Sequence, residues 1–188
     1  MKFATLILPI FLSVFCRFGH AQCRIDTKAF APGEALTYNA YYNWGIALGE
    51  LSKMKTGQEA EKLLNQAFKK YKKATRIEPN DHNAWDSWGV HLAELAKTRT
   101  GKEAEDLFTQ SFKKHQKAIE CGGTYYNLSC WYALTKNKEN ALLWLEKSLR
   151  QLEITTDFVL KDEDWSSYLH DEDFLRIIDC IMLENTNR

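Results

Sequence analysis

Histidine, cysteine and acidic side chains could do chemistry in this chain, but their spacing does not suit catalysis or metal binding. His82, His91, His115 and His170 each lack a second histidine on the same helical face. The acidic trios at 162–164 and 171–173 lack the alternating ligands of a calcium loop, and acids at helix N-termini explain them better. No phosphate loop, dinucleotide fingerprint or nucleophile elbow occurs. The sequence predicts no catalytic residue, metal or cofactor, and a protein that is not an enzyme.

Two lysine-rich stretches could instead bind anions. They end two predicted helices that begin with acidic residues: Lys69, Lys70, Lys72, Lys73, Lys113, Lys114 and Lys117. Acids at the start and bases at the end of a helix complement its dipole. We therefore favour solvated, dipole-matched helix ends over an anion-binding patch. With a formal net charge of zero, the chain has no global electrostatic reason to bind nucleic acid.

The elements that position these residues recur at a fixed offset. The segment 39–74 reappears 44 residues later with about twenty identities, as expected of stacked supersecondary units. Within each unit, apolar residues at three- and four-residue steps predict a first helix, as at Trp44, Leu48 and Leu51. Thr56 and Thr100 then open predicted capping boxes before a second helix. Each unit is therefore a helix pair.

The repeated positions resemble tetratricopeptide repeats (TPR). Helix A of that family has aromatic, large, small and large residues, matched in the second unit by Trp85, Trp88, Gly89 and Leu92. Helix B has small, aromatic, small and proline positions, matched in the first unit by Ala67, Tyr71, Ala74 and Pro79. The first two hairpins are longer than the usual repeat, and in this they are similar to plant mitochondrial import receptors of the class.

A third, shorter unit and a closing segment complete the expected architecture. Residues 164–174 look like the segment that closes bacterial repeats of this type, and an apolar stripe predicts a last helix: Phe174, Ile177, Ile178 and Ile181. The resemblance implies an all-α, TPR-like superhelical stack of antiparallel helix pairs. We expect repeats over 37–80, 81–122 and 123–153, and a C-terminal cap over 154–188.

The first residues differ in kind from the repeats. Lys2 precedes an apolar run of roughly 14 residues, and small residues at Gly19 and Ala21 suit a cut before Gln22. A run this short predicts a signal peptide over 1–21, because a membrane span needs about 20 apolar residues. We expect a secreted or periplasmic protein with no stable membrane insertion after cleavage, and an N-terminal lead over 22–36. The alternative is an uncleaved N-terminal anchor.

Export would also permit disulfides. Cys121 and Cys130 flank a Gly-Gly turn and are the first candidates for a pair. The alternative is that Cys130, in an apolar helical stretch, is a small core residue.

The concave face of a TPR stack is built from helix A, so the resemblance implies a groove that binds a protein or peptide segment. Spacing predicts its inner positions, which are mostly polar or aromatic: Asn39, Tyr42, Asn43, Ile46, Asn83, Asp86, Val90, Tyr126 and Asn127. The alternative is that some of these residues only contact neighbouring repeats.

We therefore expect an exported scaffold or adaptor that mediates protein–protein interaction through this groove. One alternative is a ligand-binding protein or enzyme with a closed pocket lined by His91, Cys130 and Tyr126. Another is a structural protein that self-associates through its aromatic faces. A deep closed cavity would favour the pocket, and an open shallow groove would favour the scaffold.

Overall fold

The computed structural model describes residues 37–186, and these residues form helices with no strand. Their order along the chain is α1 (Tyr38–Lys53), α2 (Gly57–Ile77), α3 (His82–Lys97), α4 (Gly101–Glu120), α5 (Tyr126–Leu134), α6 (Lys138–Arg150), α7 (Thr156–Val159), the 3-10 helix η1 (Glu163–Tyr168) and α8 (Glu172–Thr186). The predicted signal peptide, 1–21, and N-terminal lead, 22–36, lie outside the described residues.

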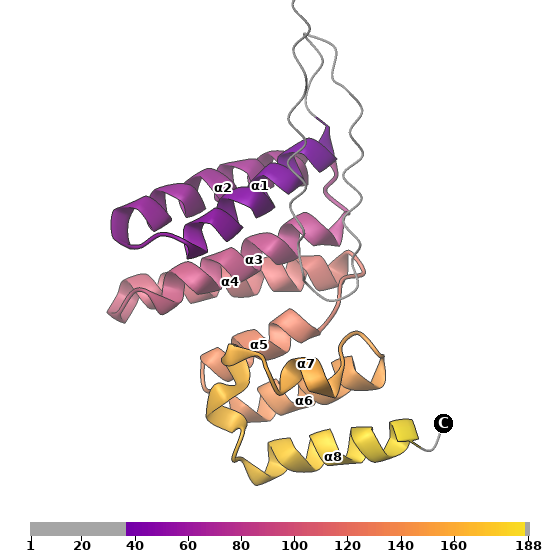
Figure 1. Ribbon diagram of the computed structural model, residues 1–188. Helices are drawn as coiled ribbons and strands as arrows, with labels where there is room; N and C mark the ends of the chain where they lie inside the picture. The colour runs from indigo at the N-terminus through magenta and orange to yellow at the C-terminus, as the bar shows by residue number, and fades with distance from the viewer. Residues whose placement is uncertain (1–36, 187–188) are drawn as a thin grey trace, which may run out of the picture.

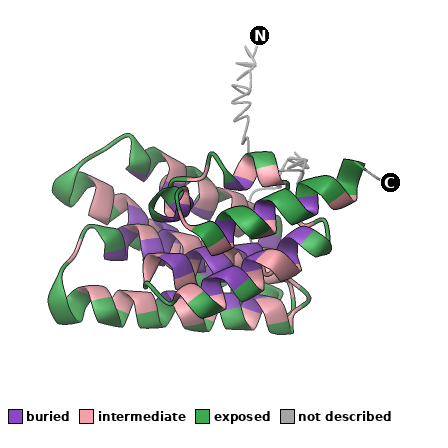
Figure 2. Ribbon diagram, turned by 90° about the horizontal axis from the view of Figure 1, so that it is seen from below, coloured by how far each residue is buried: buried purple, intermediate pink, exposed green. Residues whose placement is uncertain are grey.

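Three antiparallel helix pairs stack one on the next: α1 with α2, α3 with α4, and α5 with α6 (Figure 1). Buried residues occupy the middle of the stack, and exposed residues lie at the hairpin ends and along the outer sides (Figure 2). Trp44 and Trp88 have matching surroundings, because the Lys70 and Lys114 ammonium groups lie 3.1 and 3.9 Å from the respective ring centres. The predicted all-α, TPR-like stack is confirmed.

Close approach within each pair depends on a small residue in the first helix. A Cβ atom on Gly45 would lie 2.5 Å from the Tyr71 ring, and one on Gly89 would lie 2.7 Å from the His115 ring. Ser111 adds a buried hydrogen bond of 2.7 Å from its hydroxyl to the carbonyl of Gly89. The expected packing of small residues against bulky ones is therefore present in both pairs.

Contacts between the first two pairs use the same principle. A Cβ atom at Gly49 would overlap the imidazole of His91, which is buried and stacks on Tyr71 at 5.7 Å. The Tyr38 hydroxyl donates to Asp81 Oδ1 at 2.5 Å, and Asp81 also caps α3. Helix α1 is therefore fixed against the beginning and the middle of α3.

The turns between paired helices differ from the prediction. Thr56 and Thr100 occupy the N-cap positions, but neither side chain makes a capping hydrogen bond. Gly57 and Gly101 follow with φ of 57° and 59°, a left-handed conformation that glycine adopts without steric cost. The predicted capping boxes are wrong, because a glycine turn sets the start of each second helix.

The C-terminal segment folds back onto the third pair and shares its core. Trp165 and Phe174 are fully buried in one cluster with Leu145 of α6. Along α8, Ile178 and Ile181 continue that buried stripe, as predicted. Asp162 caps η1 at 2.9 Å and Asp171 caps α8 at 3.1 Å, so the prediction that these acids serve helix N-termini is confirmed.

The described cysteines are free thiols, so the expected pair of Cys121 with Cys130 is not formed. The Cys121 thiol lies 3.6 Å from the Pro79 carbonyl, whereas Cys130 is buried in the core shared by α5 and the C-terminal segment. This placement matches the alternative, a small core residue. No helix in residues 37–186 is long and apolar enough to cross a membrane.

Candidate functional site

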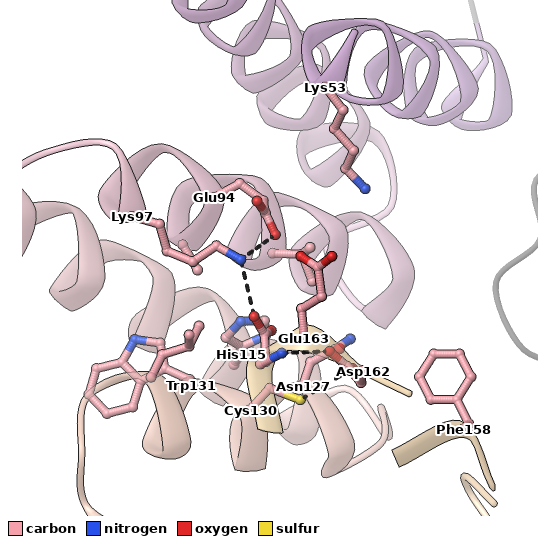
Figure 3. Close-up of a pocket in the computed structure, with 14 residues that line it drawn as sticks. Lys53, Glu94, Lys97, His115, Asn127, Cys130, Trp131, Phe158, Asp162 and Glu163 are labelled. Atoms are coloured by element: carbon pink, nitrogen blue, oxygen red, sulfur yellow. Dashed lines mark hydrogen bonds and ion pairs between the residues drawn. The ribbon is translucent and has the colours of Figure 1, made fainter. Parts of the chain in front are cut away.

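A pocket of about 550 Å³, partly open to solvent, lies between the first helices of the pairs and the C-terminal segment (Figure 3). Its lining combines four carboxylates with two ammonium groups: Glu94, Asp162, Glu163, Asp164, Lys53 and Lys97. An apolar part of the wall is formed by Val90, Ala93, Trp131, Leu134 and Phe158. The pocket therefore combines an apolar part of its wall with a formal excess of negative charge.

One side of the pocket is a single stripe of α3. Val90, Ala93, Glu94 and Lys97 occupy positions i, i+3, i+4 and i+7, so their side chains share a face of the helix. The opposite face of α3 packs in the stack through residues such as Leu92 and Leu95, which are 3% and 6% exposed. Packing of one face thus turns the other toward the pocket.

Lys97 joins two elements across the pocket. Its ammonium lies 3.0 Å from Glu94 Oε1 and 3.1 Å from Asp164 Oδ1. Burial alone would lower the pKa of Lys97, but these two carboxylates raise it above its ordinary value. Burial outweighs the ion pair at Asp164 and raises the pKa of that carboxyl. Since Lys97 already serves two acids, it does not neutralise the remaining carboxylates.

The other wall is the C-terminal segment, which covers α5. The Tyr126 hydroxyl donates to Asp162 Oδ2 at 2.7 Å, and its ring meets Phe158 edge-on at 5.8 Å. Burial and the neighbouring Asp162 raise the pKa of Tyr126. The predicted exposure of Tyr126 in the groove is therefore wrong, because the C-terminal segment occupies this part of the concave face.

Asp86 links neighbouring repeats at the edge of the pocket. Its two carboxylate oxygens accept from Asn127 Nδ2 at 2.5 Å and contact His115 Nδ1 at 2.8 Å. Of the predicted groove residues, the structure thus brings together Val90, Asn127 and Asp86, and only the first two line the pocket. Asp86 instead contacts the neighbouring repeat, which was the alternative to a groove position.

The remaining predicted groove residues do not line this pocket. Asn39 is exposed on α1, and Tyr42 stacks on Tyr38 at 5.7 Å beside the start of α3. Asn83 donates to Asp81 in the cap of α3 at 2.8 Å. Asn43 and Ile46 are partly exposed on α1.

One cluster within the lining of the pocket has the donor types of a metal site. The Cys130 sulfur and a carboxylate oxygen from each of Asp162 and Asp164 lie within 4.8 Å of one another. Burial raises the pKa of the Cys130 thiol well above its usual range, which favours the protonated form. The Asp164 carboxylate also forms an ion pair with Lys97, which competes with binding of a cation. The cluster therefore serves helix packing and capping.

The helical pattern could have extended the predicted groove along α3 beyond Val90 to Ala93 and Lys97. No local pattern could have found Phe158 or the acids 162–164, because they reach the pocket only when the C-terminal segment folds back over α5.

Comparison with known proteins gives one family. The model described as "Plant specific mitochondrial import receptor subunit TOM20" matches residues 20–148, which is more than half of the chain. No curated protein and no solved structure matches. The prediction of a secreted or periplasmic location is wrong, because the family is a mitochondrial one. A short apolar run at the N-terminus does not by itself distinguish an export signal from other targeting segments. The chain belongs to the family of plant-specific mitochondrial import receptor subunit TOM20.

Proposed function

We propose that this chain is a mitochondrial receptor component that binds a basic, amphipathic segment of another protein in the pocket between α1, α3, α5 and the C-terminal segment. The observation that carries the proposal is the composition of the wall, where the carboxylates of Asp162 and Glu163, which Lys97 does not pair with, border apolar side chains. A segment with a basic side and an apolar side satisfies both parts of that wall. The family's description as an import receptor subunit supports a protein ligand.

Pocket geometry favours this ligand over a small substrate held in a closed cavity. His91 and Tyr126, which such a cavity would need, are buried in helix packing and do not line the pocket. The partly open volume of about 550 Å³ accommodates a few side chains of a longer segment, which would extend beyond it.

Charge reversal at Glu163 tests the proposal, since this side chain lines the pocket, is exposed and forms no ion pair with the described residues. We expect Glu163→Lys to weaken binding of a fluorescent basic amphipathic peptide about five- to tenfold in an anisotropy titration. Raising the salt concentration should weaken wild-type binding in the same direction, because exposed charges are screened.

Glu105→Lys is the matched control, because it makes the same change of charge on the exposed surface of α4 outside the pocket. Equal peptide affinities for the Glu163 and Glu105 variants would show that the pocket acids do not select the ligand, and the proposal would fail.

A further inference from the structure

Basic residues gather on the second helices of the first two pairs. From residue 62 to 77, α2 carries six basic residues and no acid, and from 107 to 119, α4 carries three lysines and no acid. We call part of this surface the basic face: Lys69, Lys70, Lys72, Lys73 and Arg76 of α2 with Lys113, Lys114 and Lys117 of α4. The zero net charge of the chain therefore conceals a local excess of positive charge.

The basic face points away from the packed side of its helices. Lys69 and Lys73 lie two residues before and after Tyr71, which is fully buried, so at 100° per residue they project from the opposite side of α2. Lys113 and Lys117 flank the buried His115 in the same way. The pocket is lined mainly by α3, α5 and the C-terminal segment, and α4 reaches it through His115, on the side of that helix opposite Lys113 and Lys117. The pocket therefore opens on another side of the stack.

Residues 37–186 leave most charges of this face unneutralised. Among residues 37–186, Lys117 is the member that forms an ion pair, with Glu120 of its own helix at 3.0 Å. Burial against the aromatic rings and repulsion from Lys72 across the gap between helices both lower the pKa of Lys114. Burial and repulsion from Lys73 act in the same way on Lys70. Lysines that repel one another across two helices suit an external anionic surface.

Aromatic rings lie directly under several of these lysines. The Lys114 ammonium lies 3.9 Å from the centre of the Trp88 ring, and the Lys73 ammonium lies 5.0 Å from that of Tyr41. Trp44, beneath Lys70, is 47% exposed at the edge of the face. Tryptophan and tyrosine side chains are enriched in the headgroup region of a bilayer, where lysines bind anionic lipids.

The lysines cover aromatic rings and repel one another across two helices, so they are more than the solvated helix ends that the sequence favoured. We propose that the basic face docks on a membrane surface that carries anionic lipids. The lysines spread over the second helices of two neighbouring pairs, an arrangement that matches an extended plane of headgroups better than a single acidic peptide. In this orientation the acidic pocket faces away from the repelling lipid charges and remains accessible to a basic segment. The proposal is independent of what the pocket binds.

Vesicle co-sedimentation of the full chain tests this proposal, with neutral phosphatidylcholine vesicles compared with vesicles containing 30% phosphatidylserine, a content chosen for the experiment. The test variant combines Lys69→Gln, Lys72→Gln and Lys113→Gln, because these lysines make no ion pair among the described residues. The control variant combines Lys102→Gln, Lys136→Gln and Lys161→Gln, which removes the same charge from exposed positions outside the face.

We expect the wild type and the control variant to bind the anionic vesicles and to be released by salt. The test variant should bind them roughly 100-fold more weakly, at about fivefold for each lysine. Equal binding to neutral and anionic vesicles, or equal losses in the two variants, would overturn the proposal. Retention on an acidic polypeptide without vesicle binding would also overturn it, by assigning the face to a protein partner.

Discussion

Replacing Gly49 with alanine would put a methyl group where the imidazole ring of His91 lies. His91 is 3% exposed, and its Nδ1 lies 2.9 Å from the Ser87 carbonyl and 3.1 Å from the Tyr71 hydroxyl. The ring therefore cannot move aside without losing polar contacts at the interface between the first two pairs. Glycine at position 49 is required by the histidine that faces it.

Two opposing effects set the size of this change. Alanine is more favourable than glycine in a helix by about 1 kcal/mol. Overpacking in a closed interface costs about 1–3 kcal/mol, and loss of the Tyr71–His91 hydrogen bond costs about 1 kcal/mol more. We therefore expect Gly49→Ala to lower the free energy of unfolding by about 1–3 kcal/mol, a decrease of roughly 2–4 °C in Tm per kcal/mol for a domain of this size.

A double-mutant cycle isolates the contact, since removing the ring should reverse the sign of the effect. In a His91→Ala background the added methyl group meets no ring, so Gly49→Ala should stabilise that variant by about 1 kcal/mol. Urea unfolding followed by circular dichroism measures all four proteins. If Gly49→Ala destabilises both backgrounds equally, the close approach of α1 and α3 at this point is not what requires glycine.

Two further predictions concern buried polar groups. Burial lowers the pKa of His91, despite the neighbouring carboxylates of Glu50 and Glu94, with the nearby Lys53 lowering it further. Its folded pKa is therefore below the unfolded value of about 6.5, so its stabilising contribution is complete above that pH and is lost as the pH falls. We expect the free energy of unfolding to decrease between pH 7 and pH 5, by at most about 1.4 kcal/mol per pH unit from this group, and less steeply in His91→Gln. Parallel pH profiles in urea titrations would contradict this role for His91. Tyr126→Phe removes the hydrogen bond to Asp162 and should lower the free energy of unfolding by about 1–2 kcal/mol. Tyr125→Phe should have little effect, because the Tyr125 hydroxyl forms no hydrogen bond with residues 37–186. Similar losses in the two variants would show that Tyr126 does not fix the C-terminal segment.

The helix pairs could be predicted because their determinants are local and occur twice. Gly45 and Gly89 hold equivalent places 44 residues apart, and each faces a ring in the second helix of its own pair. The same periodicity placed Val90 and Asn127 near the concave side, where the structure has them lining the pocket. Helical spacing therefore determines which face of α3 is available to a ligand.

The closed part of the concave face could not be predicted in the same way. Tyr126 occupies an inner position by spacing, but its burial depends on Asp162, 36 residues further along the chain. That contact forms only because Trp165 and Phe174 enter the core of the third pair and draw the C-terminal segment across α5. Non-local packing of this kind leaves no periodic pattern at Tyr126 itself.

Ligand-induced shifts of methyl NMR signals test the central claim most directly, because they locate the bound segment without changing the pocket. We predict that titration with a basic amphipathic peptide shifts the methyl signals of Val90 and Leu134, which line the pocket. The methyl signals of Leu143 and Leu152, exposed outside it at 58% and 65%, should not move. Shifts confined to Leu143 and Leu152, with Val90 and Leu134 unchanged at saturating peptide, would contradict binding in the pocket.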